Sequence, residues 1–190
     1  MKWVIPWLVA GWLAAVPCRG QDVFFVEDKP GDAAFSGEDA EGLDLVRITF
    51  SRKGSSRIEI DFRMKDTIPR TPKGDYMIIA YLDFNTPAGE DPSLTETTAD
   101  LNVLAFKVPG YANWECRVDK AFGSLAKETF QIVKFNQHRN GFSIDLSSPV
   151  FKEPIRIGGY AESIVEGKAV DRAPETASFT WQESNLLLRP

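Results

Sequence analysis

The chain has 190 residues, 43% of them hydrophobic and 26% charged, and its formal net charge at pH 7 is −5. This length suits one domain with a well-covered core, whereas the acidic balance disfavours nucleic-acid binding because it repels phosphate backbones. The two cysteines, Cys18 and Cys116, are too few for a Cys-rich metal site.

Residues 1–20 have the pattern of a secretory signal peptide. Lys2 precedes an apolar run over residues 3–16, and small residues follow before the chain turns polar. The run is shorter than the roughly 20 apolar residues that a membrane-spanning helix needs. We therefore expect cleavage after Gly20 and an exported domain, periplasmic or extracellular, over residues 21–190. Lipidation at Cys18 is the alternative.

The first half of the mature chain alternates between apolar and polar residues. A short apolar stretch at 24–26 predicts a first strand, which ends at the Pro30–Gly31 turn. Residues 45–50 and 57–65 both repeat with a period of two, as half-buried strands do. Gly54 lies between them and suits a tight hairpin.

Short strand patterns continue to the C-terminus. They cover residues 75–84, 99–108, 128–135, 141–146, 154–164 and 177–181, and only 120–128 suggests a helical turn. Asn140–Gly141 predicts a turn, and Gly158–Gly159 predicts a bulge or a close approach of another chain segment. Roughly eight to ten strands without a linker predict an all-β fold, a single two-sheet antiparallel β-sandwich of the jelly-roll or immunoglobulin-like type.

Three stretches resemble a group of secreted bacterial β-sandwich domains. They are "DKPGD" followed by "DLVRITF", "YMIIAYLDFNTPAGED", and "DRAPETASFTW". The group is related to the DOMON-like and family 9 carbohydrate-binding sandwiches. The resemblance implies a sandwich fold and sugar binding, with haem or calcium in some related domains. Haem is not expected here, because Met64 and Met77 lie in apolar alternation and His138 is the only histidine.

Sugar binding needs an exposed aromatic ring beside polar groups, because the apolar face of a pyranose stacks on a ring. The stretch "GYANWE" offers Tyr111, Asn113 and Trp114, and Trp181 is a further candidate. The alternative is that both tryptophans fill the core between the sheets, as tryptophan often does in sandwiches.

Calcium is the ion that the sequence favours, because it prefers six to eight oxygen ligands from irregular loops. Two acidic loops qualify. The first contains Glu27, Asp28 and Asp32, and the second contains Asp83, Asn85, Glu90 and Asp91. The alternative is that these side chains are simply solvated.

No catalytic motif is evident. A nucleophile would have to use His138, and the pattern places Cys116 as a buried small residue, while no Gly-x-Ser-x-Gly elbow is present. A hydrolase that uses a pair of acids is the second alternative, because the chain has 27 acidic residues and its sequence does not indicate which two would form the pair. We therefore expect a non-catalytic domain that binds carbohydrate or a cell-envelope polymer. The first alternative is a calcium-stabilised structural or adhesion module.

Overall fold

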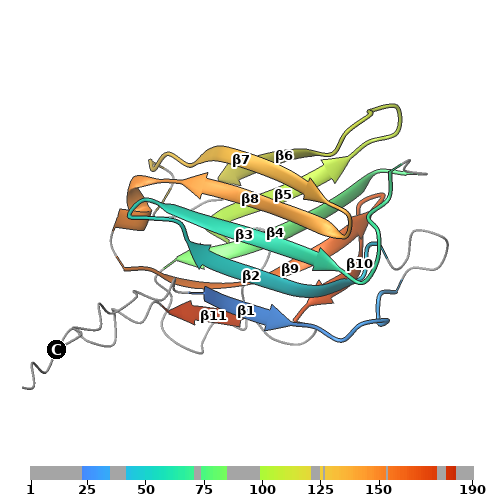
Figure 1. Ribbon diagram of the computed structural model, residues 1–190, viewed down its shortest axis with the longest axis horizontal. Helices are drawn as coiled ribbons and strands as arrows, with labels where there is room; N and C mark the ends of the chain where they lie inside the picture. Colours follow the sequence, from blue (N-terminus) through green and yellow to red (C-terminus); the bar gives the residue numbers. More distant parts are fainter. Residues whose placement is uncertain are drawn as a thin grey trace, which may run out of the picture.

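The computed structural model describes residues 23–34, 42–70, 74–84, 99–120, 125, 127–152, 154–174 and 179–182. Within them the chain forms two antiparallel sheets that face each other (Figure 1). The predicted all-β sandwich is thus confirmed. The predicted signal peptide and Cys18 lie outside the described residues, as do most of residues 120–128.

The first sheet has the strand order β1-β2-β3-β8-β7. Its strands are β1 (Val23–Glu27), β2 (Leu45–Arg52), β3 (Arg57–Met64), β8 (Gly141–Ser147) and β7 (Gln131–His138). The predicted β2–β3 hairpin is present, with Phe50 opposite Ile60. Strand β7 extends further toward the Asn140–Gly141 turn than the sequence indicated, because it pairs with β8 up to His138.

The second sheet has the order β10-β9-β4-β5-β6, and β11 also pairs with β9. Its strands are β10 (Lys168–Ala173), β9 (Arg156–Val165), β4 (Tyr76–Phe84), β5 (Leu101–Lys107), β6 (Glu115–Lys120) and β11 (Phe179–Gln182). A 3-10 turn, η1 (Pro149–Lys152), follows β8. The strand ranges predicted from sequence omitted β6 and β10.

The core fills the space between the two sheets. On β3, Ile58, Ile60 and Phe62 point inward and are fully buried, while the charged residues between them face outward. Alternate residues of β4 and β5 cover them from the other sheet. On β9, a Cβ at Gly159 would lie 2.4 Å from the Tyr81 carbonyl oxygen, so the close approach predicted for this glycine is confirmed.

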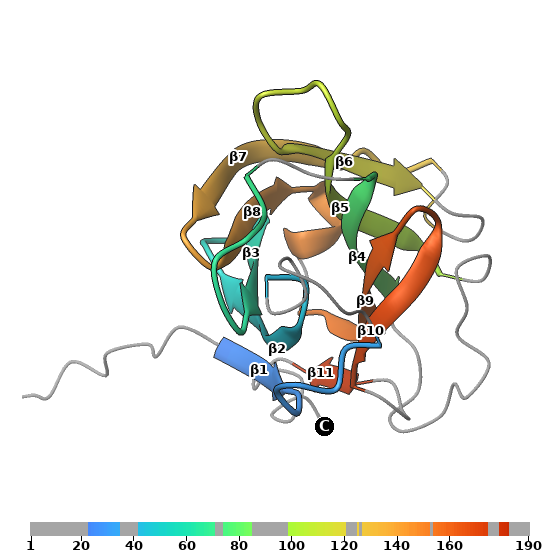
Figure 2. The ribbon, with the colours of Figure 1, turned by 90° about the vertical axis from the view of Figure 1, so that its right-hand side faces the viewer.

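The segment of residues 65–70, which follows β3, lies at one end of the sandwich (Figure 2). Its Ile68 amide donates to the Arg139 carbonyl at 3.0 Å, in the β7–β8 turn. Its Pro69 carbonyl accepts from the Trp114 indole at 3.0 Å, and its Arg70 carbonyl accepts from the Lys107 ammonium. The segment therefore fixes the loops of both sheets at this end.

Truncation of an inward-facing side chain should cost far more than truncation of an outward-facing one on the same hairpin. We expect Ile60→Ala to lower the free energy of unfolding by about 2–5 kcal/mol, because it leaves a cavity in the core. Thr49→Ala on the outer face of β2 should change it by less than about 0.5 kcal/mol. Urea unfolding measures both, and similar losses would contradict the assigned faces.

Candidate functional site

The loop after β1 runs from the first sheet to the second. The Asp28 amide donates to the Val46 carbonyl of β2 at 3.0 Å, and the Ala34 amide donates to the Val170 carbonyl of β10 at 2.5 Å. Between these anchors Gly31 has φ +92°, which glycine adopts without strain. The loop therefore places its acidic side chains where the edges of the two sheets meet.

Three carboxylates converge in this region. Asp28, Asp32 and Asp171 each offer an oxygen, and these oxygens all lie within 4.8 Å of one another. Both carboxylate oxygens of Asp32 are buried and have no hydrogen-bond partner among the described residues. Such a concentration of negative charge is costly away from water unless a cation or a proton offsets it.

Backbone amides hold Asp171 in place. Its Oδ2 accepts from the Leu45 amide at 2.6 Å, and its Oδ1 accepts from the Arg172 amide at 2.8 Å. Only 8% of its surface is exposed. Burial raises its pKa to about 7, and the charges of Asp28 and Asp32 add to the rise, while the two amides oppose it.

A fourth acidic side chain, Asp44, stands just before β2 and supports the loop. Its Oδ2 accepts from the Gly31 amide at 2.6 Å and lies 3.9 Å from the Lys65 ammonium. Glu27, by contrast, points elsewhere, because its carboxylate pairs with Arg47 at 2.5 Å on the surface. Of the first predicted loop, Asp28 and Asp32 thus reach the cluster and Glu27 does not.

The second predicted acidic loop is described only in part. Asn85, Glu90 and Asp91 lie outside the described residues. Asp83 forms a carboxyl–carboxyl hydrogen bond with Asp100, whose Oδ2 also accepts from the Phe84 amide at 3.1 Å. Burial, together with Asp83, raises the pKa of Asp100 to about 6. A pair in direct contact is closer than the roughly 5–10 Å between the two acids of glycosidases.

The aromatic candidates need a correction, because Trp114 and Trp181 are each only 3% exposed. The Trp114 ring centroid lies 4.7 Å from that of Phe142, and the Trp181 centroid lies 5.8 Å from that of Phe50. Burial of the Trp114 indole removes a large apolar surface from water, which is favourable. Its N–H still donates to the Pro69 carbonyl, so burial leaves this polar group with a partner. Neither ring face is available to a ligand.

Tyr111 remains exposed, at 61%. It lies at a cavity of about 170 Å³ whose described lining residues are Phe106, Lys107, Val108, Tyr111, Asn113 and Glu115. The buried Lys107 donates to the Ala112 carbonyl at 3.2 Å and so fixes this loop. Tyr111 and Asn113 thus both line this cavity, whereas Trp114 and Trp181 are buried in the core and are not among its described lining residues.

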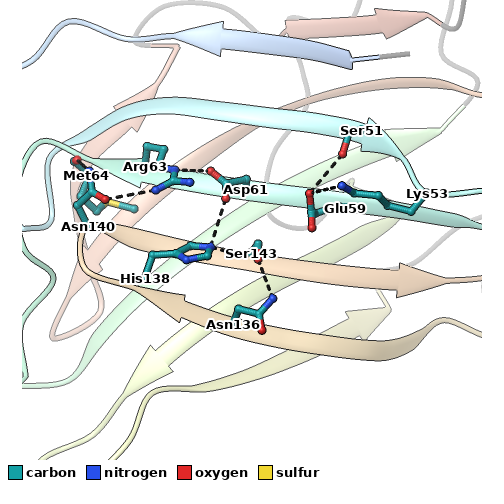
Figure 3. Close-up of polar contacts among 10 residues, drawn as sticks. All are labelled: Ser51, Lys53, Glu59, Asp61, Arg63, Met64, Asn136, His138, Asn140 and Ser143. Carbon is teal, nitrogen blue, oxygen red and sulfur yellow. Dashed lines mark hydrogen bonds and ion pairs between the residues drawn. The ribbon is translucent and has the colours of Figure 1, made fainter. Parts of the chain in front are cut away.

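A polar array covers the outer face of the first sheet (Figure 3). It includes Asp61, His138 and Ser143, the residue types of a serine-hydrolase triad. However, His138 Nε2 faces both the Asp61 carboxylate at 3.6 Å and the Ser143 hydroxyl at 3.3 Å. In a triad the acid and the serine contact opposite ring nitrogens, so this array lacks the geometry that activates a nucleophile.

Cys116 is not placed to replace that serine. It lies on β6 of the other sheet and packs against the core, and burial raises the pKa of its thiol. The two methionines considered for haem pack in different hydrophobic clusters, Met64 in the main core and Met77 in the smaller cluster around Ile79.

Comparison with family models, with curated proteins and with solved structures gave no match. Within the described part of the chain, no helix has the length and apolar character to cross a membrane. The acidic cluster and the Tyr111 cavity are therefore the two candidate sites among the described residues.

The raised pKa of Asp171 makes stability depend on pH. An aspartate in an unfolded chain titrates near pH ~3.9, so the folded protein binds this proton more tightly. The resulting stabilisation is complete below about pH 4 and is lost as the pH rises through about 7. In calcium-free buffer, we expect the Tm to fall between pH 5 and pH 8, and Asp171→Asn to reduce that fall. Thermal unfolding followed by circular dichroism measures the Tm at each pH. The same dependence of Tm on pH in the wild type and in the variant would contradict the raised pKa of Asp171 as its cause.

Proposed function

We propose that this protein is a non-catalytic β-sandwich that binds a divalent cation through Asp28, Asp32 and Asp171. The observation that carries the proposal is the convergence of three carboxylates within 4.8 Å, one of which has two buried oxygens without a described hydrogen-bond partner. Calcium is the cation that best suits several carboxylates on an irregular loop.

The position of the cluster supports a structural role. Asp28 and Asp32 follow β1 of the first sheet, whereas Asp171 belongs to β10 of the second. A cation held by all three would tie the sheet edges together and offset their mutual repulsion. Export, which the N-terminal sequence predicts, would suit such a site, because extracellular modules bind calcium with Kd values of about 10⁻⁴–10⁻³ M.

Calcium should therefore raise the Tm of the full chain. At a calcium concentration about 100 times the Kd, mass action stabilises the folded state by about 2.7 kcal/mol. For a domain of this size that corresponds to about 5–10 °C. Asp32→Asn should abolish most of the increase because it removes a ligand charge, whereas Asp75→Asn, an exposed acid outside the cluster, should keep it. Differential scanning calorimetry with added calcium or with EDTA measures the shift.

An unchanged midpoint with calcium, magnesium and manganese would contradict the cation site. An equal increase in the wild type and in Asp32→Asn would place the bound ion elsewhere in the chain.

Carbohydrate binding is a second candidate, and the Tyr111 cavity favours it. The exposed Tyr111 ring offers an apolar face, while Asn113 and Glu115 offer hydrogen-bonding groups beside it. Protein–sugar recognition combines these two elements. The cavity is small, so it suits one sugar unit or the end of a chain, such as that of an envelope polymer.

Tyr111→Ala should weaken binding to neutral polysaccharides by about two- to tenfold, since stacking on an aromatic ring contributes about 0.5–1.5 kcal/mol beyond area burial. Phe25→Ala is the matched control, because Phe25 is 56% exposed and lies on β1 of the other sheet. A glycan array followed by affinity electrophoresis provides the measurement. Absence of binding in both the wild type and the variant would remove this candidate.

A further inference from the structure

Another pocket lies at the end of the sandwich that residues 65–70 occupy. Basic side chains line it, in contrast to the acidic cluster. Its volume is about 440 Å³, and its described lining residues are Ile68, Arg70, Gln137, His138 and Arg139. We call it the cationic pocket. The Arg139 carbonyl accepts from the Ile68 amide at 3.0 Å, and the Arg139 Nε donates to the Thr67 hydroxyl at 3.2 Å. These bonds fix the two chain segments that form the pocket.

The charge of this pocket differs from that of the chain. The protein has 27 acidic against 22 basic residues, yet the described lining includes two arginines, one histidine and no carboxylate. Two acids lie close to the pocket. Asp61 accepts from Arg63 Nε at 2.6 Å and lies 3.6 Å from His138 Nε2. Asp66 accepts from the Thr67 amide at 2.6 Å, and the charge of Arg139 helps to lower its pKa, so a ligand would compete with this exposed carboxylate for Arg139.

The two guanidinium groups are available to a ligand. Among the described residues, neither Arg70 nor Arg139 takes part in a salt bridge, and both are exposed. A guanidinium group presents a planar set of donors that matches the two oxygens of a carboxylate or sulfate. Gln137 adds an amide that can donate to a further oxygen or accept from a hydroxyl.

We propose that the cationic pocket binds the oxyanion group of an acidic saccharide, a carboxylate or a sulfate ester. Two arginines suit one such group, whereas a nucleic-acid backbone presents many phosphates in a row. The site is distinct from the acidic cluster and does not require the proposed cation. It rests on the second proposed function only in that the ligand is a saccharide.

Isothermal titration calorimetry in calcium-free buffer tests the proposal with three probes: oligogalacturonate, a sulfated oligosaccharide and neutral dextran. Binding should be seen with at least one acidic probe and should weaken as salt is added. Dextran should not bind at this pocket. The double variant Arg70→Gln/Arg139→Gln should weaken the acidic probe by about tenfold or more, as expected for charge-assisted hydrogen bonds.

Two controls separate this outcome from general effects. Arg117→Gln removes one positive charge from β6 on the other sheet and should leave binding unchanged. Arg139→Lys keeps the charge in the pocket but loses the planar fork of donors, so binding should weaken, though by less than in Arg139→Gln. No binding of either acidic probe, an equal loss in Arg117→Gln, or unchanged binding in the double variant would overturn the proposal. The calcium-dependent Tm shift would be unaffected by any of these results.

Discussion

The burial of two apolar sheet faces against each other is the constraint on which the rest of the molecule depends. The inward-facing side chains of β3 have almost no solvent exposure, and β4 and β5 cover them from the opposite sheet. Because side chains alternate along a strand, a slip of one residue would bring Glu59, Asp61 and Arg63 into the core. The register is thereby fixed, and the polar array of the outer face follows from the same pairing.

The fold could be predicted from sequence because alternation is a local signal. The β2–β3 hairpin and the close approach at Gly159 both rest on a few adjacent residues. Strand β10 was missed because its short sequence carries charges and only part of it is buried. Edge strands of this kind lack the continuous apolar pattern that identifies central ones.

The site could be predicted only in part, because it joins distant segments. Asp28 and Asp32 stand close together in one loop, whereas Asp171 reaches them through the pairing of β10 with β9. The burial of Trp114 could not be read locally, because its partners Pro69 and Phe142 come from other segments.

The loop after β1 also links an edge strand to the acidic cluster. Among the described strands β1 pairs only with β2, so it is an outermost strand of the described sheet. The residues that follow it supply two of the three clustered carboxylates. Detachment of β1 would therefore dismantle the acidic cluster, and an ion bound there would in turn hold β1 against its sheet. Detachment of β1 from the sheet and loss of an ion from the cluster would therefore be coupled in one local opening equilibrium.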